Sequence, residues 1–418
     1  MERFIVEGGN QLKGSLQVKG AKNSMLPIMA AAVLNTSNSS IELQNIPNIY
    51  DMHVMKKILE SLGYSVDFQS SSLTITPGDS INHAISDDLM REMRSSIFLM
   101  GPLIARIGRV KLTYPGGCSI GPRPIDLHFK GLESLGAQIR EENGCIEAFA
   151  HRLKGTDIHL DYPSVGATEN LMMAAVLAQG KTVIHNVAKE PEIVDVQNFL
   201  NAMGCRVRGA GTDTLRIEGV DFAGPCEYRI IPDRIVAGTY LMAAAITGGS
   251  ITLQEIIPSH LDAVVAKLKE AGVEIEGTED SLTVHNGNLK AVETLRTLPH
   301  PGFPTDLQAP MMALLTKARG NSMIVESIFE ERFRHVDQLK KMNANIVAKG
   351  RNALITGVDR LVGAEVEATD LRAGAALVLG GLAAEGTTII NNIWHIDRGY
   401  ESMEIDLGSL GANIQRTG

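Results

Sequence analysis

The segment ATENLMMAAVLAQG (residues 167–180) carries small and apolar side chains on nearly every face of a helix drawn through it. A helix that is apolar all round must be buried on all sides. Strand-like segments flank it at 158–160 and 182–186, and an amphipathic segment follows at 193–203. A hairpin pattern at 205–218 completes the unit. We therefore expect a β-α-β-α-β-β module, which cannot bury its first helix alone.

The same pattern recurs along the whole chain. Six segments rich in Ala, Met and Leu match the first helix of the module: 23–35, 94–108, 167–180, 234–249, 306–320 and 370–386. A residue suited to the left-handed conformation ends each second helix, at intervals of 68 to 73 residues: Gly63, Gly136, Gly204, Gly272, Asn343 and Gly411. Such regular spacing indicates internal repeats.

Six modules predict an α/β fold of two domains. Three modules around one axis would bury the apolar helices inside and leave the sheets outside. The alternative is a linear solenoid that binds a protein partner. Solenoid repeats usually span about 20–50 residues, so the longer period favours the first arrangement.

Composition and charge exclude several functional classes. The net charge is −9 and aromatic residues make up 4% of the chain, so no nucleic acid is expected as a partner. The longest apolar runs fall well short of the ~20 residues that cross a bilayer, so no membrane is expected either. The cysteines lack C-x-x-C spacing, which predicts a reducing, cytoplasmic compartment and no zinc ribbon: Cys118, Cys145, Cys205 and Cys226.

The starts of the predicted buried helices carry most of the candidate site residues, and most of these are charged or polar: Lys22, Asn23, Arg94, Ser164, Val165, Gly166, Asp306, Asp370 and Arg372. Helix N-termini carry partial positive charge and unpaired N–H groups, so several of them with added cations would form an anion site. Asp306 and Asp370 could equally be simple helix caps. An arginine at a helix start is opposed by the dipole, and a bound anion would explain it.

One segment, YPGGCSIGPRP (114–124), contains three prolines and three glycines around Cys118 and Arg123. This composition excludes regular helix or strand and predicts an exposed, mobile loop between a strand and the second helix of module two. A cysteine five residues from an arginine is expected to have a lowered pKa. Cys145, Cys205 and Cys226 lie in or beside predicted elements and are expected to be structural.

Eight segments together resemble the enolpyruvyl transferase family over the whole chain: VKGAKNS (18–24), MRSSI (93–97), LTYPGGCSIGPRPIDLH (112–128), SVGATEN (164–170), HPGFPTDLQA (300–309), FEERFRHV (329–336), ATDLRAGAAL (368–377) and HIDRGYE (395–401). The Gly-Gly-Cys loop is specific to the branch that acts on UDP-N-acetylglucosamine. The shikimate branch lacks it and begins with Ser-Lys-Ser, where this chain has Ala21-Lys22-Asn23.

The resemblance implies a fold of two inside-out α/β barrel domains, each built from three β-α-β-α-β-β modules. One domain would comprise residues 22–231 and carry the Cys118 loop. The other would comprise residues 1–21 and 232–418, because the N-terminal strand of the family pairs into the second domain. The active site is expected in the cleft between them.

The resemblance further implies transfer of the enolpyruvyl group of phosphoenolpyruvate to the 3-hydroxyl group of UDP-N-acetylglucosamine, with release of phosphate, in the first committed step of peptidoglycan synthesis. The implied catalytic residues are Cys118, Asp306 and Lys22. Phosphoenolpyruvate would contact Lys22, Asn23, Arg123, Arg332, Asp370, Arg372 and Arg398. The nucleotide sugar would contact Asn23, Arg94, Arg123, Pro124, Ile125, Asp126, Leu127, Ser164, Val165, Gly166, Asp306 and Ile328.

This reaction needs a base at the sugar hydroxyl, an acid at the methylene carbon and cations at the leaving phosphate. It needs no metal and no cofactor, and the sequence contains no ligand cluster for one. Three alternatives stay open for Cys118: a general acid, a covalent trap for phosphoenolpyruvate, or both. Tyr162 departs from the family pattern, in which a lysine can precede the Ser164 segment. The rival functions are a shikimate-type transferase and a non-enzymatic repeat scaffold.

Overall fold

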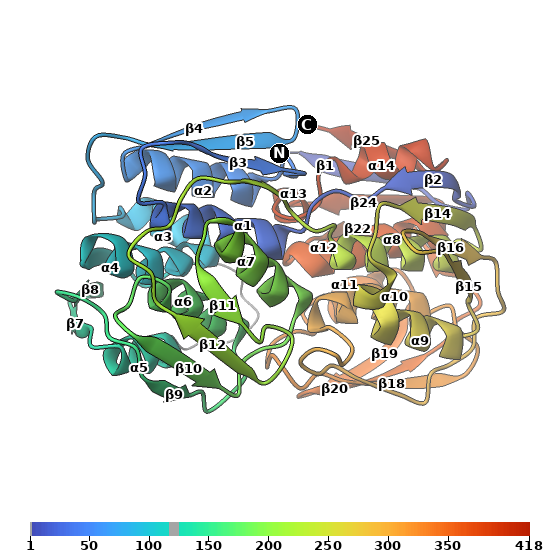
Figure 1. The fold of residues 1–418 in the computed structure, drawn as a ribbon. Coiled ribbons are helices and arrows are strands. Elements are labelled where there is room, and N and C mark those ends of the chain that lie inside the picture. Colours follow the sequence, from blue (N-terminus) through green and yellow to red (C-terminus); the bar gives the residue numbers. More distant parts are fainter. Residues whose placement is uncertain (1, 117–124) are drawn as a thin grey trace. The chain divides into compact units, whose positions relative to one another are not determined.

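The computed structural model describes residues 2–116 and 125–418. Their contacts define two compact units (Figure 1). The first unit comprises the described residues from 20 to 231, and the second unit comprises residues 2–19 and 232–418. Each unit has a hydrophobic core of its own. No helix within the described ranges is long and apolar enough to cross a membrane.

Three sheets build the first unit, with strand orders β13-β3-β5-β4, β6-β8-β7 and β11-β12-β10-β9. The strands are β3 (Ile41–Gln44), β4 (Tyr64–Gln69), β5 (Ser72–Pro77), β6 (Arg109–Thr113), β7 (Gln138–Glu142), β8 (Cys145–Phe149), β9 (Asp157–His159), β10 (Lys181–His185), β11 (Arg206–Arg208), β12 (Thr214–Glu218) and β13 (Glu227–Arg229). The helices are α1 (Lys22–Ala31), the 3-10 helix η1 (Ala32–Leu34), α2 (Tyr50–Ser61), α3 (Asp87–Glu92), the 3-10 helix η2 (Arg94–Leu99), α4 (Met100–Ile107), α5 (Asp126–Ser134), α6 (Val165–Ala175) and α7 (Pro191–Ala202).

The second unit repeats this plan with sheets ordered β15-β16-β14-β2, β17-β18-β20-β19 and β22-β24-β1-β25. The strands of these three sheets are β1 (Arg3–Glu7), β2 (Lys13–Gln17), β14 (Ser250–Gln254), β15 (Glu274–Gly277), β16 (Leu282–His285), β17 (Thr294–Arg296), β18 (Asn321–Val325), β19 (Asn345–Lys349), β20 (Asn352–Thr356), β22 (Glu365–Glu367), β24 (Thr387–Asn391) and β25 (Asn413–Thr417). Two short strands, β21 (Leu361–Val362) and β23 (Ala384–Glu385), form a further two-stranded sheet. Its main helices are α8 (Arg234–Ile246), α9 (Asp262–Glu270), the 3-10 helix η4 (Thr305–Leu307), α10 (Gln308–Leu315), α11 (Val336–Lys341), α12 (Leu371–Ala383), α13 (Trp394–Asp397) and α14 (Met403–Ser409).

The apolar helices form the centre of each unit, which confirms the inside-out arrangement. In the second unit α8, α10 and α12 contact one another, and each also contacts the strands of its own module. Every residue from Leu371 to Leu382 in α12 is buried. The sheets present only one apolar face, because buried residues alternate with more exposed ones along β18 and β24.

The predicted turn residues adopt the conformation expected of them. Gly63, Gly136, Gly204, Gly272 and Gly411 all have positive φ, and so does Asn343, with a φ of 69°. Glycine reaches this region without a steric penalty, and asparagine tolerates it better than most residues. The same left-handed turn conformation therefore recurs once in each of the six modules.

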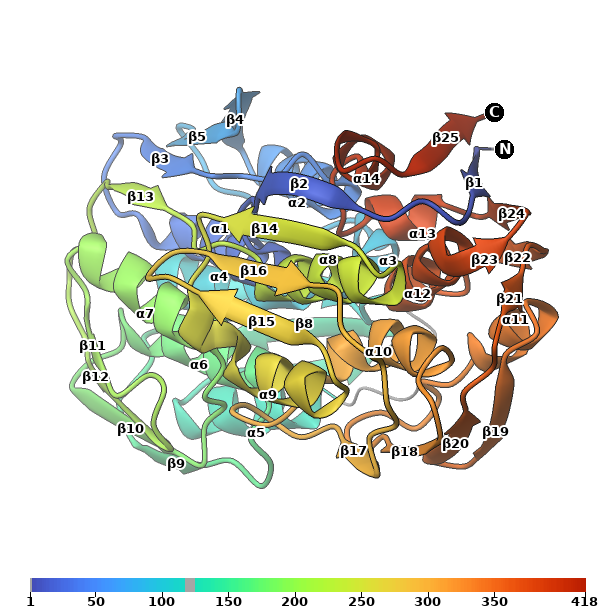
Figure 2. The same cartoon turned by 90° about the vertical axis from the view of Figure 1, so that its right-hand side faces the viewer.

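Two strands pair into a sheet of one unit, although the next helix along the chain belongs to the other unit. β2 precedes α1 of the first unit but pairs in parallel with β14 of the second, as Figure 2 shows. Conversely, β13 precedes α8 of the second unit but pairs in parallel with β3 of the first. The N-terminal strand β1 lies between β24 and β25, antiparallel to both, and so pairs with the C-terminal part of the chain.

Candidate functional site

A buried ion pair lies at the start of α1 in the first unit. The Lys22 ammonium lies 2.7 Å from Oδ2 of Asp51, which is in the first turn of α2. The two side chains are 10% and 1% exposed. Lys22 begins α1 and does not precede it, so its charge lies at a helix N-terminus, where the dipole disfavours a cation. Asp51 supplies the compensating charge.

A second polar group in the first unit surrounds His128, a residue that the sequence analysis did not assign to the site. The side-chain oxygen of Asn170 accepts from the Gly101 N–H at 2.6 Å, so the Asn170 amide nitrogen must face Nδ1 of His128, 2.9 Å away. Nδ1 is therefore an acceptor, and the proton of the neutral ring is on Nε2. Burial and the charge of Arg94 lower the pKa of His128 to about 4. Burial also lowers the pKa of Arg94.

The N-terminus of α6 lies beside this histidine. Ser164 is the N-cap, and its hydroxyl accepts from the Ala167 N–H at 3.3 Å. Val165 and Gly166 form the first turn of α6, where backbone N–H groups have no intrahelical acceptor. A Cβ at Gly166 would lie 3.4 Å from Nε2 of His128, so glycine keeps this approach open. The arrangement suits an anion that takes N–H groups from the turn and from the ring.

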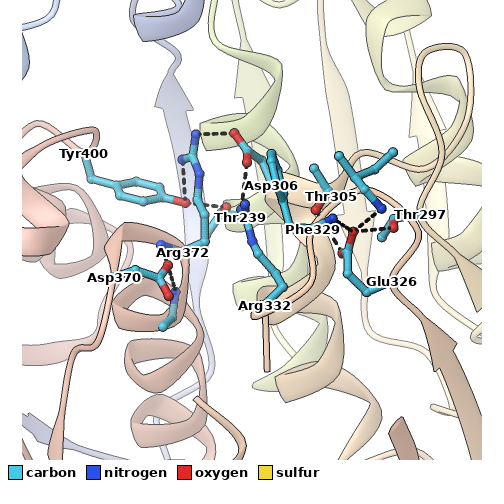
Figure 3. A network of polar contacts seen from close by, with 12 residues as sticks. Thr239, Thr297, Thr305, Asp306, Glu326, Phe329, Arg332, Asp370, Arg372 and Tyr400 are labelled. Carbon is cyan, nitrogen blue, oxygen red and sulfur yellow. Dashed lines mark hydrogen bonds and ion pairs between the residues drawn. The ribbon is translucent and has the colours of Figure 1, made fainter. Parts of the chain in front are cut away.

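The second unit holds a tighter cluster, drawn in Figure 3. The Asp306 carboxylate accepts from Arg332 at 2.7 Å and from Arg372 at 2.9 Å. Both arginines are buried, whereas the Asp306 side chain is 24% exposed. The guanidinium of Arg372 also lies 3.5 Å from the hydroxyl of Tyr400, which is hydrogen-bonded to Thr239. Two buried cations therefore share one accessible carboxylate.

These charges determine the protonation state of Asp306. Burial raises the pKa of its carboxyl group, but the charges of Arg372 and Arg332 outweigh burial and hold the pKa well below its usual value. The opposite influence acts on Arg372: burial lowers its pKa, and Asp306 more than compensates. Asp306 is ionised, as a base must be, but the arginines make it a weak base while they hold it.

The capping interpretation holds for one aspartate and is wrong for the other. Asp370 caps α12, because its Oδ1 accepts from the backbone N–H groups of Arg372 at 2.9 Å and Ala373 at 3.0 Å. Asp306 makes no capping bond, and Pro304 is the N-cap of η4. The anion that accounts for an arginine at the start of α12 is the Asp306 carboxylate itself.

Several of the remaining predicted site residues lie at or beside the end of a helix. Ile125 is the buried N-cap of α5, and Asp126 and Leu127 are in its first turn. Arg398 follows α13 and is 8% exposed. The N–H of Ile328 already donates to Glu326 at 2.8 Å, so a ligand there would meet a different atom. Cys118, Arg123 and Pro124 lie outside the described residues.

Sequence reasoning also missed Glu326. It follows β18 directly and is 1% exposed, and its carboxylate accepts four hydrogen bonds. The available signal was a carboxylate immediately after an apolar strand, where a buried charge requires partners.

Comparisons with known proteins agree on one family. A model described as EPSP synthase (3-phosphoshikimate 1-carboxyvinyltransferase) matches residues 6–407. UDP-N-acetylglucosamine 1-carboxyvinyltransferase 1 of Caldanaerobacter subterraneus subsp. tengcongensis is 53% identical, with 99% of each chain covered. The protein of the same name from Symbiobacterium thermophilum is 54% identical over 99% of this chain and 95% of its own.

Two solved structures share the fold. The enolpyruvyl transferase NikO from Streptomyces tendae superposes with a TM-score of 0.90 at 24% identity, covering 100% of this chain and 99% of its own. EPSP synthase from Acinetobacter baumannii superposes with a TM-score of 0.77 at 18% identity, and both chains are covered completely. The two-unit plan of six modules is therefore a known architecture.

Proposed function

This chain belongs to the enolpyruvyl transferase family, and on that premise we propose that it transfers the enolpyruvyl group of phosphoenolpyruvate to the 3-hydroxyl group of UDP-N-acetylglucosamine and releases phosphate. The nucleotide-sugar acceptor is favoured over shikimate 3-phosphate by the relatives. Those named for UDP-N-acetylglucosamine are 53% and 54% identical, whereas the EPSP synthase structure is 18% identical. The step belongs to peptidoglycan synthesis.

The observation that carries this function is the set of buried cations in a chain of net charge −9. Lys22, Arg332, Arg372 and Arg398 are each less than a tenth exposed. Buried cations are costly unless anions accompany them. Phosphoenolpyruvate and the diphosphate of the nucleotide sugar are both strongly anionic, so they match these positions in charge.

The chemistry requires a proton to leave one substrate and another to join the second. The sugar oxygen forms a bond to C2 of phosphoenolpyruvate while its proton passes to a base, and C3 gains a proton from an acid. The resulting tetrahedral intermediate then loses phosphate and a C3 proton, which restores the double bond. We assign the base to Asp306 and the acid to Cys118, with its possible covalent role left open.

Asp306 can perform this role only if its partners change. An anion that binds Arg332 and Arg372 competes with the carboxylate for the same donors. Once the arginines are shared with substrate, less positive charge acts on Asp306 and its pKa rises towards that of an ordinary carboxylate. Binding of the anionic substrate therefore makes Asp306 a stronger base.

The other sites are assigned by family pattern and supported by local geometry. Lys22, Asn23, Arg123, Arg332, Asp370, Arg372 and Arg398 are proposed to bind phosphoenolpyruvate. The residues proposed to bind the nucleotide sugar are Asn23, Arg94, the segment 123–127, Ser164, Val165 and Gly166 at the N-terminus of α6, Asp306 and Ile328. We place the enzyme in the cytoplasm, which is consistent with Cys145, Cys205 and Cys226 being free thiols.

The test is phosphate release from phosphoenolpyruvate by the purified protein. Release should require UDP-N-acetylglucosamine and should be negligible with shikimate 3-phosphate or with no acceptor. Mass spectrometry should then find the sugar nucleotide heavier by one enolpyruvyl group. Release with shikimate 3-phosphate alone would reassign the acceptor, and no release with either would favour a non-enzymatic scaffold.

A further inference from the structure

Asp306, the proposed base, and its partner Arg332 belong to a closed ring of contacts that also includes Glu326. Asp306 lies next to Thr305, and Arg332 lies three residues beyond Phe329. Asp306 and Arg332 pair with each other at 2.7 Å. Each is also tied, through its neighbour, to the Glu326 carboxylate, as the network in Figure 3 shows.

Asp306 is linked to Glu326 through the hydroxyl group of its neighbour Thr305. Thr305 Oγ1 donates to Oε2 of Glu326 at 2.9 Å. Thr305 opens η4, so this bond fixes the start of the turn that carries Asp306. The Asp306 side chain itself bonds outside the turn, to Arg332 and Arg372.

Arg332 is linked to Glu326 through the backbone and the aromatic ring of Phe329. Oε1 of Glu326 accepts from the N–H groups of Ile328 at 2.8 Å and Phe329 at 3.1 Å. The guanidinium carbon of Arg332 lies 5.2 Å from the centre of the Phe329 ring, within the range of a cation–π contact. Fixing the Phe329 backbone therefore fixes the surface on which Arg332 rests.

A third tie anchors the carboxylate to a sheet. Thr297, which follows β17 and is fully buried, donates to Oε1 of Glu326 at 2.9 Å and accepts from the Ser327 N–H at 3.0 Å. All four donors to Glu326 are neutral, and at 1% exposure the side chain has no access to substrate. Its carboxylate therefore serves to hold chain segments.

We propose that Glu326 is a positioning residue that sets the distance between Asp306 and Arg332. This inference rests on the proposed function, since it concerns the base of that reaction. A displacement of about 1 Å in a reacting group can cost a factor of about 10² in rate, so the loss should appear in turnover. Nucleotide binding should change less than turnover, because its proposed contacts other than Asp306 and Ile328 lie in the first unit.

The experiment compares three variants with wild type. Glu326→Ala removes all four bonds and should lower kcat about 10- to 100-fold, with KM for UDP-N-acetylglucosamine within about threefold. Glu326→Gln keeps a carbonyl oxygen for the N–H groups and an amide that can donate to the Thr305 hydroxyl, so it should stay within about fivefold. Glu330→Gln, an exposed carboxylate in the same segment that pairs with Arg351, is the matched control and should match wild type.

The double variant shows whether Glu326 acts through Asp306. In an Asp306→Asn background, Glu326→Ala should cost much less than it does in wild type, because residues that act as a unit are not additive. Independent, multiplying losses would overturn the proposal. So would a Glu326→Gln enzyme as impaired as Glu326→Ala, since that result would require the charge itself.

Deuterium exchange provides a readout that needs no activity. In Glu326→Ala, peptides covering 305–307 and 327–332 should both exchange faster than in the Glu330→Gln control. If Glu326→Ala does not fold, Thr305→Val replaces it: it removes one bond and should accelerate exchange at 305–307 and lower kcat by a smaller factor. Unchanged exchange in these peptides would overturn the positioning role. Accelerated exchange in a protein whose wild type releases no phosphate would support the positioning role and count against the proposed function alone.

Discussion

The two units neutralise their buried cations in different ways. In the first unit one cation meets one carboxylate, Lys22 with Asp51, and both are almost sealed from water. In the second unit two cations, Arg332 and Arg372, share Asp306, whose side chain is a quarter exposed. The first pair is closed to solvent. The second cluster joins two guanidinium groups to one carboxylate that solvent reaches, so we expect a substrate anion to be able to displace that carboxylate.

The largest expected effect is a loss of turnover, which should distinguish the Asp306 carboxylate from that of Asp51. Asp306→Asn removes the proposed base and should lower kcat by about 10²–10⁴. Steady-state phosphate release measures it. The matched control is Asp337→Asn, in which an exposed aspartate of α11 is changed and wild-type turnover is expected. Near-normal turnover of Asp306→Asn in a well-folded protein would remove Asp306 from the chemistry and leave it an ion-pair partner.

For stability we expect the opposite order, with a larger loss in Asp51→Asn than in Asp306→Asn. Asp51→Asn removes the carboxylate that pairs with the buried Lys22, and breaking a buried pair from one side costs about 3–5 kcal/mol. For a unit of this size that is a fall in melting temperature of roughly 6 °C or more. Calorimetry measures it, with Asp161→Asn as control, since that aspartate forms an exposed pair with Lys130 at 2.9 Å. A smaller fall for Asp51→Asn than for Asp306→Asn would reverse the assignment of closed and exchangeable pairs.

A third prediction concerns competition for the arginines. Without the Asp306 carboxylate, Arg332 and Arg372 are free for another anion, so Asp306→Asn should bind inorganic phosphate about tenfold more tightly than wild type. Titration calorimetry at constant ionic strength measures the difference. Equal affinities in the two proteins would mean that phosphate does not compete with Asp306.

Acid should weaken the same cluster. Because the folded-state pKa of Asp306 is depressed, its contribution to stability is fully present above the usual carboxyl pKa near ~4 and is lost as pH falls further. The stability difference between wild type and Asp306→Asn should therefore shrink below about pH 4. A difference that stays constant to pH 2 would contradict the depressed pKa.

The smallest effect is expected at a carboxyl group that has no cation. Glu169 in α6 is fully buried, and neither of its oxygens has a hydrogen-bond partner among the described residues. Burial, with added repulsion from Glu192 and Glu190, raises its pKa well above the usual value. The unfolded chain loses this proton at lower pH than the folded one, so Glu169 destabilises the fold increasingly as pH rises.

Glu169→Gln tests this sign. The variant should melt about 2–4 °C above wild type at pH 8, a gain of about 1 kcal/mol, with no gain near pH 4. Glu133→Gln, an exposed change in α5, should show no such trend. A gain that is independent of pH would mean that Glu169 is not kept protonated by the fold.

The repeated architecture was predictable because each module repeats its own local requirements. The apolar first helices, the left-handed turn residues and the alternating strands are all visible within a window of seventy residues. The exchange of β2 and β13 could not be derived from the strand patterns, because each strand has the same pattern whichever sheet it joins, and only the domain boundaries taken from the family resemblance implied it. Pairing depends on the partner edge, which lies more than 180 residues away for β13 and more than 230 for β2.

The site was predictable in part. Helix starts and family motifs located Lys22, Arg94, Asp306 and Arg372, but not their partners. Asp306 as a helix cap was the simplest local interpretation, and it failed because two arginines from 26 and 66 residues away supply stronger donors. Glu169 belongs to a segment that the sequence predicts as an apolar buried helix, because the eight apolar residues 171–178 outweigh one carboxyl group.

The pairing of β1 between β24 and β25 determines the order in which a ribosome can release finished parts of this molecule. Everything the first unit needs has been synthesised once residue 231 has emerged. Residues 3–7, although made first, find their partners only when 387–417 have been translated. Until then β1 lacks both of its sheet neighbours, and exposed strand edges invite pairing with other chains. A chain that lacked residues 413–417 would leave the edge of β1 that pairs with β25 permanently open.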